Sequence, residues 1–347
     1  MEISSTPKLS PFASLKVVEF RNLMLGRFLF IMGLRMMGTL VGWWIYELTN
    51  EPFAIGLIGL AEVIPAVSLA LYAGHVIDIS EKRKLLLRGV ILYWICAIIL
   101  LGLSIYNDKA DNTNAFAANR TLIIAICIYF VVFCTGIIRS FTGPSFGTIV
   151  GGIIPKDLLQ NATTWSQGIW LSASVLGHAI VGFIIAGFGH TGSLIVVVSL
   201  VGIGYGFIAM IKSKPPHADV VDQKTLESVK EGLRFVFNSK ELFGALSLDL
   251  FAVLFGGAVA MIPVFAKDIL KVGPIGFGWL NAASDIGAII IILIITIFPA
   301  NRGQGKKLLL AVAGFGLCII VFALSKIFWL SFIMLLLSGI LDGFSMI

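Results

Sequence analysis

Long apolar runs separated by short polar segments extend over most of the chain. The run from Leu85 to Tyr106 has about the length, roughly 20 residues, that an α-helix needs to cross the hydrocarbon core of a bilayer. A transmembrane barrel would instead show short stretches in which apolar and polar residues alternate. Hydrocarbon offers the backbone no hydrogen-bond partner, so continuous apolar runs must cross it as helices. The pattern predicts an all-α membrane protein with ten spans, at about 22–46, 53–76, 85–106, 121–150, 162–187, 191–212, 241–266, 275–299, 307–325 and 328–347.

The composition and the charge distribution agree with a membrane environment. Hydrophobic residues make up 58% of the 347 positions and charged residues 13%, against about 25% charged in an average soluble domain. The net charge of +6 would by itself allow a nucleic-acid partner. The basic residues are instead sorted along the chain: with the N-terminus inside, 18 of the 25 Lys and Arg residues fall in inner segments and five in outer ones. The positive-inside rule therefore predicts a cytoplasmic N-terminus, and we expect no nucleic-acid partner.

The sequence offers little sign of catalysis or metal binding. It contains neither a G-x-x-x-x-G-K-[ST] phosphate loop nor an H-E-x-x-H zinc motif. Its four cysteines all lie in apolar runs, without the paired spacing of a metal site or a disulfide framework. We interpret them as small packing residues. The sequence therefore predicts no enzyme, no cofactor and no resident metal.

The longest polar stretch, residues 212–240, divides the chain into two halves. It opens with a Pro-Pro pair that breaks the sixth predicted helix, and apolar residues then return at nearly helical spacing. We expect an amphipathic helix on the inner face of the membrane. The predicted parts are a six-helix bundle at 1–211, a cytoplasmic linker at 212–240 and a second bundle at 241–347, which is the layout of a two-domain transporter.

Short similarities recur in the same order in the two halves. Residues 55–67, which open the second span, resemble residues 277–289, which open the eighth. Residues 134–141 of the fourth span resemble residues 337–344 of the tenth. Each similarity is short, but their common order favours two related halves.

The loop between the second and third predicted spans, GHVIDISEKRK, carries the most specific motif. It is similar to the signature G-x-x-x-D-[RK]-x-G-[RK]-[RK] of the major facilitator superfamily, which it matches at Gly74, Asp78, Lys82 and Arg83. Glycine lets helices approach closely, and an aspartate at a helix end can pair with basic groups across a mobile interface. The resemblance implies a gate loop that stabilises one of two access states.

A wider resemblance points to one branch of that superfamily. Residues 43–78 and 248–280 look like the bacterial enterobactin exporters, also called transmembrane secretion effectors, and the likeness covers most of the chain. It implies the major facilitator fold of two pseudo-symmetric six-helix bundles. It also implies a multi-pass protein of the bacterial inner membrane that exports a small-molecule cargo, driven by an ion gradient, for which a proton is the expected ion. The sequence does not determine the oligomeric state, and we expect a monomer.

The end of the sequence suggests an incomplete chain. Members of the superfamily usually have twelve spans, whereas this sequence stops within its tenth apolar run. We therefore expect about ten spans here, with the last two helices missing.

Ionisable residues inside the apolar runs are candidates for a polar pathway, because each costs at least ~2.5 kcal/mol in hydrocarbon. Asp249 and Asp285 lie roughly 12 to 15 Å into their spans, near the midplane. A carboxyl at that depth can take up and release a proton as a cavity alternates between sides. Together with Glu62 they are candidates for ion coupling or cargo contact, the alternative being a structural salt bridge or a helix cap.

The other embedded groups leave further alternatives open. Arg139 and Asp342 occupy corresponding places in the two halves, and we predict an ion pair between them across the domain interface. Arg35 either binds an anionic cargo or neutralises Glu62. His178 either relays a proton or is held by ordinary hydrogen bonds in packing.

Three aromatic residues, Trp43, Trp44 and Tyr46, end the first predicted span. We expect them to form an aromatic belt at the membrane surface, the alternative being a substrate site.

These features predict a secondary active transporter that exports a small molecule by alternating access, in which two related bundles rock about a midplane site. One alternative is a passive facilitator or channel, which needs no coupling group. Another is a non-transporting membrane receptor or assembly partner, for which the 212–240 linker would be the docking surface.

Overall fold

The computed structural model describes residues 10–109, 117–212, 234–239, 243–244, 247, 256–297 and 304–345. The regular elements in these ranges are helices. The long ones are α1 (Val18–Thr49), α2 (Pro52–Ile79), α3 (Lys82–Lys109), α4 (Ala117–Ile153), α5 (Leu159–Ala209), α9 (Gly273–Ile297), α10 (Gln304–Leu324) and α11 (Phe328–Ser345). The short ones are η1 (Ser14–Lys16), η2 (Lys156–Leu158), η3 (Gly256–Met261), α8 (Ile262–Val264) and η4 (Phe265–Ile269).

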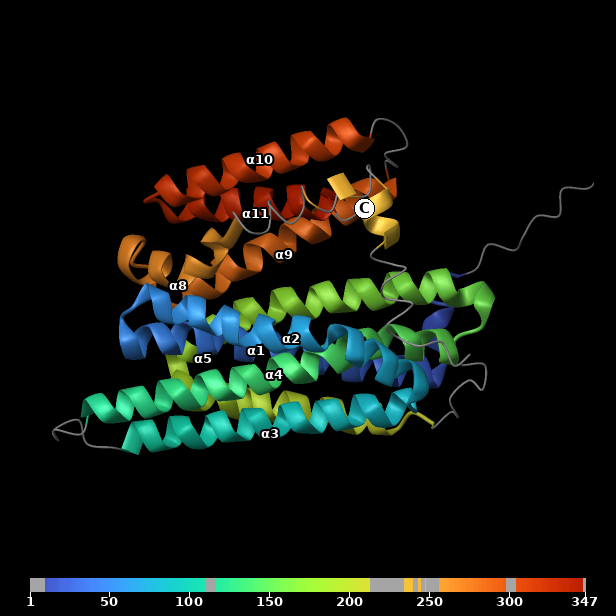
Figure 1. Cartoon of the computed structure of the whole chain (residues 1–347), viewed down its shortest axis with the longest axis horizontal. Helices are drawn as coiled ribbons and strands as arrows, with labels where there is room; N and C mark the ends of the chain where they lie inside the picture. The colour runs from blue at the N-terminus through green and yellow to red at the C-terminus, as the bar shows by residue number, and fades with distance from the viewer. Residues whose placement is uncertain are drawn as a thin grey trace, which may run out of the picture.

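The long helices run side by side along the longest axis of the molecule (Figure 1). We call its two ends the Asn50 end, where α1 turns into α2, and the Ser80 end, where α2 turns into α3. Asn50 adopts a left-handed conformation, with φ 51°, and its amide donates to the carbonyl of Tyr46. Such a cap satisfies one of the last carbonyls of the helix and reverses the chain.

The helix α5 contains two membrane spans. It bends at Gly189, whose φ of 66° and ψ of −164° are far from helical values. We call residues 159–188 its first arm and residues 190–209 its second arm. The predicted break between the fifth and sixth spans is confirmed, although a single glycine makes the turn instead of a loop.

The described helices account for most of the expected spans. Seven helical segments are long and apolar enough to cross a bilayer, with α5 counted once. When the two arms of α5 are counted separately and the shorter α11 is added, nine of the ten expected spans correspond to helices of the described residues. Of the seventh, 241–266, residues 256–266 form η3, α8 and the start of η4 instead of one long helix, and of residues 241–255 only 243, 244 and 247 are described. The expected amphipathic helix of the 212–240 linker lies mostly outside the described residues.

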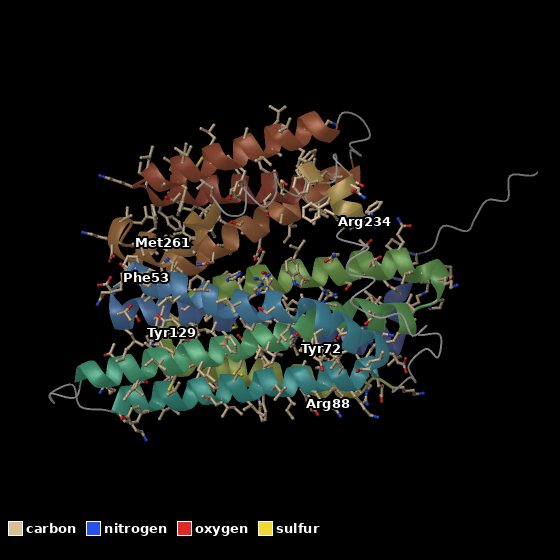
Figure 2. The ribbon with its side chains drawn as sticks, viewed as in Figure 1. Phe53, Tyr72, Arg88, Tyr129, Arg234 and Met261 are labelled. Atoms are coloured by element: carbon tan, nitrogen blue, oxygen red, sulfur yellow. The ribbon has the colours of Figure 1, made fainter. Side chains whose placement is uncertain are left out.

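The helices form two groups (Figure 1). In the first bundle, α1 packs along both arms of α5, α2 packs on α4, and α3 packs on α4 and α5. In the second bundle, α9 and α10 both pack on α11. The bundles meet where α9 contacts α5, and also where η3 contacts α2. Phe53 of α2 and Met261 of η3 mark this second meeting point, at the Asn50 end (Figure 2).

The helix α1 is enclosed by its neighbours, which corrects one expectation. Trp43, Trp44 and Tyr46 are 3%, 1% and 3% exposed, so they do not form a belt facing the membrane surface. Trp43 packs against Phe277 of α9 with ring centroids 5.1 Å apart, and Trp44 stacks on His190. The prediction of an aromatic belt was wrong because an aromatic cluster at the end of a span has the same sequence pattern in a central helix and in a peripheral one.

Candidate functional site

A cavity of about 300 Å³ lies between the two bundles. This volume is at the lower end of the range for small-molecule sites. Its walls come from both bundles: from α1 to α5 on one side, and from η3, α8 and α9 on the other. Its ionisable lining residues are Arg35, Glu62, Tyr93, Arg139 and His178.

Three stripes of residues spaced four apart place polar groups at the cavity or beside it. On α1 the stripe is Arg35 and Thr39, on α5 it is Trp170, Ser174 and His178, and on α9 it is Phe277, Asn281 and Asp285. Residues four apart lie on the same face of a helix. Thr39, Trp170, Ser174 and Asn281 were not among the predicted site residues. Their spacing from Arg35, His178 and Asp285 is the sequence signal that would have found them.

A chain of polar contacts joins three helices beside the cavity. Thr39 Oγ1 lies 2.5 Å from His178 Nδ1, and His178 Nε2 lies 3.6 Å from Asp285 Oδ2. The Ser174 hydroxyl donates to the same carboxylate oxygen over 2.5 Å. Because His178 and Ser174 belong to α5 and Asp285 belongs to α9, this chain crosses from one bundle to the other.

The geometry suits a site that holds one proton. The Thr39 hydroxyl donates its only hydrogen to the carbonyl of Arg35 over 2.9 Å, so it accepts a hydrogen bond from His178 Nδ1–H. Nε2 then faces the Asp285 carboxyl. At 3.6 Å the two groups face each other without a hydrogen bond in this structure, and either of them is a group that can take up a proton.

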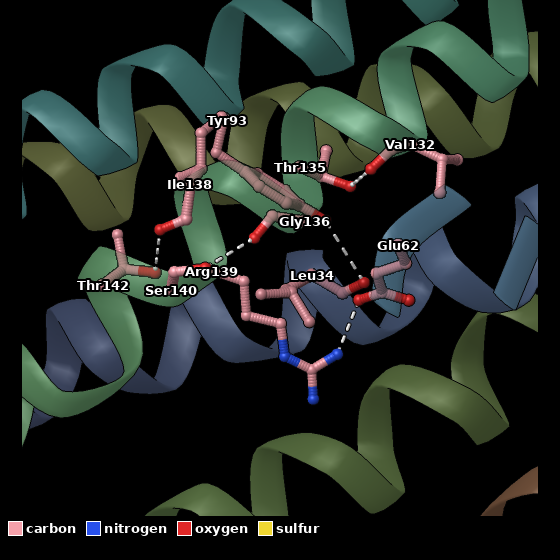
Figure 3. A network of polar contacts seen from close by, with 10 residues as sticks. All are labelled: Leu34, Glu62, Tyr93, Val132, Thr135, Gly136, Ile138, Arg139, Ser140 and Thr142. Carbon is pink, nitrogen blue, oxygen red and sulfur yellow. Dashed lines mark hydrogen bonds and ion pairs between the residues drawn. The ribbon is translucent and has the colours of Figure 1, made fainter. Parts of the chain in front are cut away.

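Glu62 and Arg139 form an ion pair on the cavity wall (Figure 3). Arg139 Nη1 lies 2.6 Å from Glu62 Oε1 and bridges α4 to α2 within the first bundle. Arg139 is 52% exposed and Glu62 34% exposed as side chains, so water in the cavity reaches both. The predicted pair between Arg139 and Asp342 is not the contact that Arg139 makes here. That pair stays a prediction.

Arg35 makes a different kind of contact. Its guanidinium lies over the Trp170 ring, 5.1 Å from the centroid. Glu62 makes its direct ion pair with Arg139, while its charge still acts on Arg35 from a distance. The two alternatives for Arg35 stay predictions.

The predicted gate loop lies at the Ser80 end, away from the cavity. The Arg83 guanidinium donates to the carbonyl of Ala209 over 2.7 Å, where α5 ends. A cation at the last carbonyls of a helix complements the helix dipole. Lys82 begins α3, and the side chain of Asp78 lies outside the described part of the structure. An added Cβ at Gly74 would meet no described atom within 4 Å, so the close helix approach expected at Gly74 is not seen.

Two other predicted site residues are not among the described residues that line the cavity. Asp249 lies outside the described residues. Asp342 lies near the end of α11 and is not among the residues that line the cavity.

A five-residue sequence, GPSFG at 143–147, has the spacing of a hydrolase nucleophile elbow but not its structure. It lies within the continuous helix α4, whereas the elbow is a sharp turn from strand to helix. Ser145 is completely buried and donates to the carbonyl of Phe141 over 2.6 Å. It is a packing residue of the helix.

Contacts at the Asn50 end hold the two bundles together. The Tyr46 hydroxyl donates to Asp268 of η4, and Lys267 Nζ donates to the side chain of Asn50 over 2.7 Å. Gly182 of α5 and Gly278 of α9 also meet there, since an added Cβ at Gly278 would lie 3.1 Å from the Cα of Gly182. Toward the Ser80 end, α9 (orange) leans away from the first arm of α5 (light green) in Figure 1.

A polar cavity between two bundles of membrane-spanning helices is the arrangement of a secondary transporter. The sequence matches the family model described as transmembrane secretion effector over residues 9–341. The chain belongs to this family, a branch of the major facilitator superfamily, whose members are transporters and not enzymes. No curated protein matches the chain in sequence.

Solved transporter structures share the fold. The nucleoside transporter NupG (D323A mutant) has a TM-score of 0.70 at 15% identity, over 94% of this chain and 79% of NupG. A bacterial homologue of the iron transporter ferroportin has a TM-score of 0.66 at 16% identity, over 96% of this chain and 82% of its own. A D-xylose–proton symporter has a TM-score of 0.61 at 11% identity, over 96% and 80%. These identities support the fold alone.

Proposed function

We propose that the protein exports a small molecule by alternating access and that the export is driven by protons. The observation that carries the proposal is the contact of His178 with Asp285, because it can hold one proton and lies between the two bundles. A transition that separates α5 from α9 would part the two groups. Proton uptake and the change of access would then be linked.

The arrangement of the two ends supports the alternating part of the proposal. With the N-terminus inside, as the distribution of basic residues predicts, the Asn50 end faces the outside of the cell. The contacts of Tyr46 and Lys267 close that end, while the bundles diverge toward the Ser80 end. We therefore assign the structure to an inward-facing state of a bacterial inner-membrane protein.

A two-stage measurement in bacterial cells tests the proposal. Cells with and without the protein are first compared for accumulation of siderophores, antibiotics and dyes, to find a compound that the protein expels. Efflux of that compound is then measured at several imposed pH gradients for the wild type, Asp285→Asn, His178→Gln and Asp249→Asn. The control is Asp157→Asn, because Asp157 is an exposed carboxyl in η2, outside the cavity.

We expect Asp285→Asn and His178→Gln to lose the dependence of efflux on the pH gradient, and Asp157→Asn to keep it. Asp249→Asn shows whether that carboxyl, placed near the midplane on sequence grounds, takes part. If all three cavity and midplane variants keep pH-driven efflux like the wild type, the coupling role proposed for these groups is wrong.

The alternatives give other results in the same assay. A passive facilitator would show flux that follows the cargo concentration and ignores the pH gradient in the wild type. A receptor or assembly partner would expel no compound, and its function would depend on the 212–240 linker. Active uptake would raise accumulation instead of lowering it, which would reverse the proposed direction.

A further inference from the structure

Arg35 is an arginine of the cavity wall that makes no direct ion pair in the described structure. Within the described residues, no carboxylate oxygen lies within 4.0 Å of its guanidinium, and its contact is with the Trp170 ring. By comparison, Arg139 is paired with Glu62 at 2.6 Å. Arg35 nevertheless lines the cavity, so its charge is available to whatever enters.

The carboxyl groups near Arg35 are held by other partners. Glu62 is bound by Arg139, and Asp285 receives the Ser174 hydroxyl and faces His178 Nε2. An ionised group in a low-dielectric site is costly unless an opposite charge or hydrogen bonds compensate it. Arg35 therefore makes no ion pair of its own, although the charges of Asp285 and Glu62 act on it from a distance. Its guanidinium donors remain for an anionic ligand.

A second arginine lies on the same helix toward the Ser80 end. Arg27 is two turns from Arg35, about 12 Å along the axis. Its guanidinium lies over the Phe146 ring at 5.2 Å and donates to the Ser166 hydroxyl, and its Nε is buried without a hydrogen-bond partner in the described structure. Like Arg35, Arg27 is supported by an aromatic ring and a neutral group instead of a carboxylate. Arg27 does not line the cavity, and along α1 it lies between Arg35 and the Ser80 end.

The remaining cavity wall is mostly apolar. It includes the rings of Tyr93 and Phe277, the side chains of Ile55, Ile58 and Pro263, and few polar groups besides those already described. Ligand sites of this kind bind an apolar body through the wall and fix its orientation through a few polar groups.

We propose that Arg35 anchors the anionic group of the cargo, and that the cargo is a small organic anion with an apolar or aromatic body and a carboxylate. A guanidinium offers two parallel N–H donors that match the two oxygens of a carboxylate. Stacking on Trp170 holds the guanidinium plane without using those donors. The inference rests on the proposed transport function, whose cargo class it specifies.

Equilibrium binding to the full chain in lipid nanodiscs tests the inference. Radiolabelled benzoate and benzamide are compared, because they share the aromatic ring and differ in the charge of the polar group. The measurement is made at one pH without a gradient, so a failure of proton coupling cannot affect it. The variants are Arg35→Gln, Arg35→Lys and, as the matched control, Arg88→Gln, since Arg88 is an exposed arginine of α3 outside the cavity.

We expect the wild type and Arg88→Gln to bind benzoate more tightly than benzamide. Arg35→Gln should lose at least ten-fold in benzoate affinity while its benzamide affinity stays within two-fold, which also shows that the variant is folded. Arg35→Lys should recover part of the preference, because it keeps the charge but not the planar donor pair. Equal affinity of the wild type for both compounds, absence of benzoate binding, or an unchanged preference in Arg35→Gln would each overturn the inference.

Discussion

Gly189 determines that one continuous helical run crosses the membrane twice. Its backbone, at φ 66° and ψ −164°, lies in a region that only glycine occupies without strain. No neighbouring atom lies within 4 Å of an added Cβ, so the constraint comes from the backbone and not from packing.

We therefore predict that Gly189→Ala destabilises the protein by about 1 to 3 kcal/mol. Gly187→Ala is the matched control, because Gly187 lies two residues earlier in the helix and also has open space around it. The control should be neutral or slightly stabilising, since alanine favours helices. Thermal unfolding of both variants in the same detergent is the measurement. A melting temperature of Gly189→Ala equal to that of Gly187→Ala would contradict the role of the backbone conformation.

The Glu62–Arg139 pair is partly hydrated, and its contribution should be small. Pairs that water reaches typically contribute about 1 kcal/mol or less. We predict that Glu62→Gln and Arg139→Gln each lower thermal stability slightly, and that the double variant costs less than the sum of the two. A double-mutant cycle of melting temperatures measures this coupling. Additive effects would show that the 2.6 Å contact does not contribute to stability.

Helix packing in the second bundle depends on close approach of α9 and α11. An added Cβ at Gly339 of α11 would lie 2.0 Å from the carbonyl oxygen of Ser284 in α9. Backbone atoms cannot move aside as a flexible side chain can, and small residues at such positions let membrane helices associate. At Gly316 of α10, in contrast, the space around an added Cβ is open.

Gly339→Ala should therefore lower stability by about 1 to 3 kcal/mol, the usual cost of inserting a group into a packed interface. Gly316→Ala should be neutral or stabilising. The two variants differ in position but not in the group added, so their yields and melting temperatures after purification can be compared directly. Equal stability would mean that α9 and α11 separate easily enough to accept the methyl group.

At the scale of the whole molecule, the contacts of the Asn50 end keep the bundles closed on that side. The Tyr46–Asp268 hydrogen bond joins α1 to η4, and the Lys267–Asn50 hydrogen bond lies beside it. Both connect the first bundle to the second. Weakening them should shift the population toward a state in which the cavity opens at the Asn50 end.

Labelling of a cysteine in the cavity wall measures that shift. Asn281 lines the cavity, and Asn281→Cys would be introduced after the four native cysteines are replaced. We predict that a membrane-impermeant maleimide added at the Asn50 end labels this cysteine faster when Tyr46→Phe and Asp268→Asn are present. Tyr106→Phe is the control, because Tyr106 is an exposed tyrosine of α3. Unchanged labelling would mean that other contacts, such as Gly182 with Gly278, suffice to keep this end closed.

The fold class, the nine spans that correspond to described helices, and four of the five ionisable residues that line the cavity could be predicted from the sequence alone. The reason is that the cost of placing a group in hydrocarbon applies to each segment independently of its neighbours. Arg35, Glu62, Arg139 and His178 on the cavity wall, and Asp285 beside it, were found in this way.

The sequence could not show which of these groups are partners, because their pairing depends on tertiary packing. Glu62 binds Arg139 instead of Arg35, and His178 meets Asp285 across the two bundles, because helix rotation and packing bring together residues far apart in the chain. The same packing encloses Trp44 at the centre of the first bundle. Pairing depends on which faces the helices turn toward each other, and hydropathy along a single span carries no information about the neighbour that a face will meet.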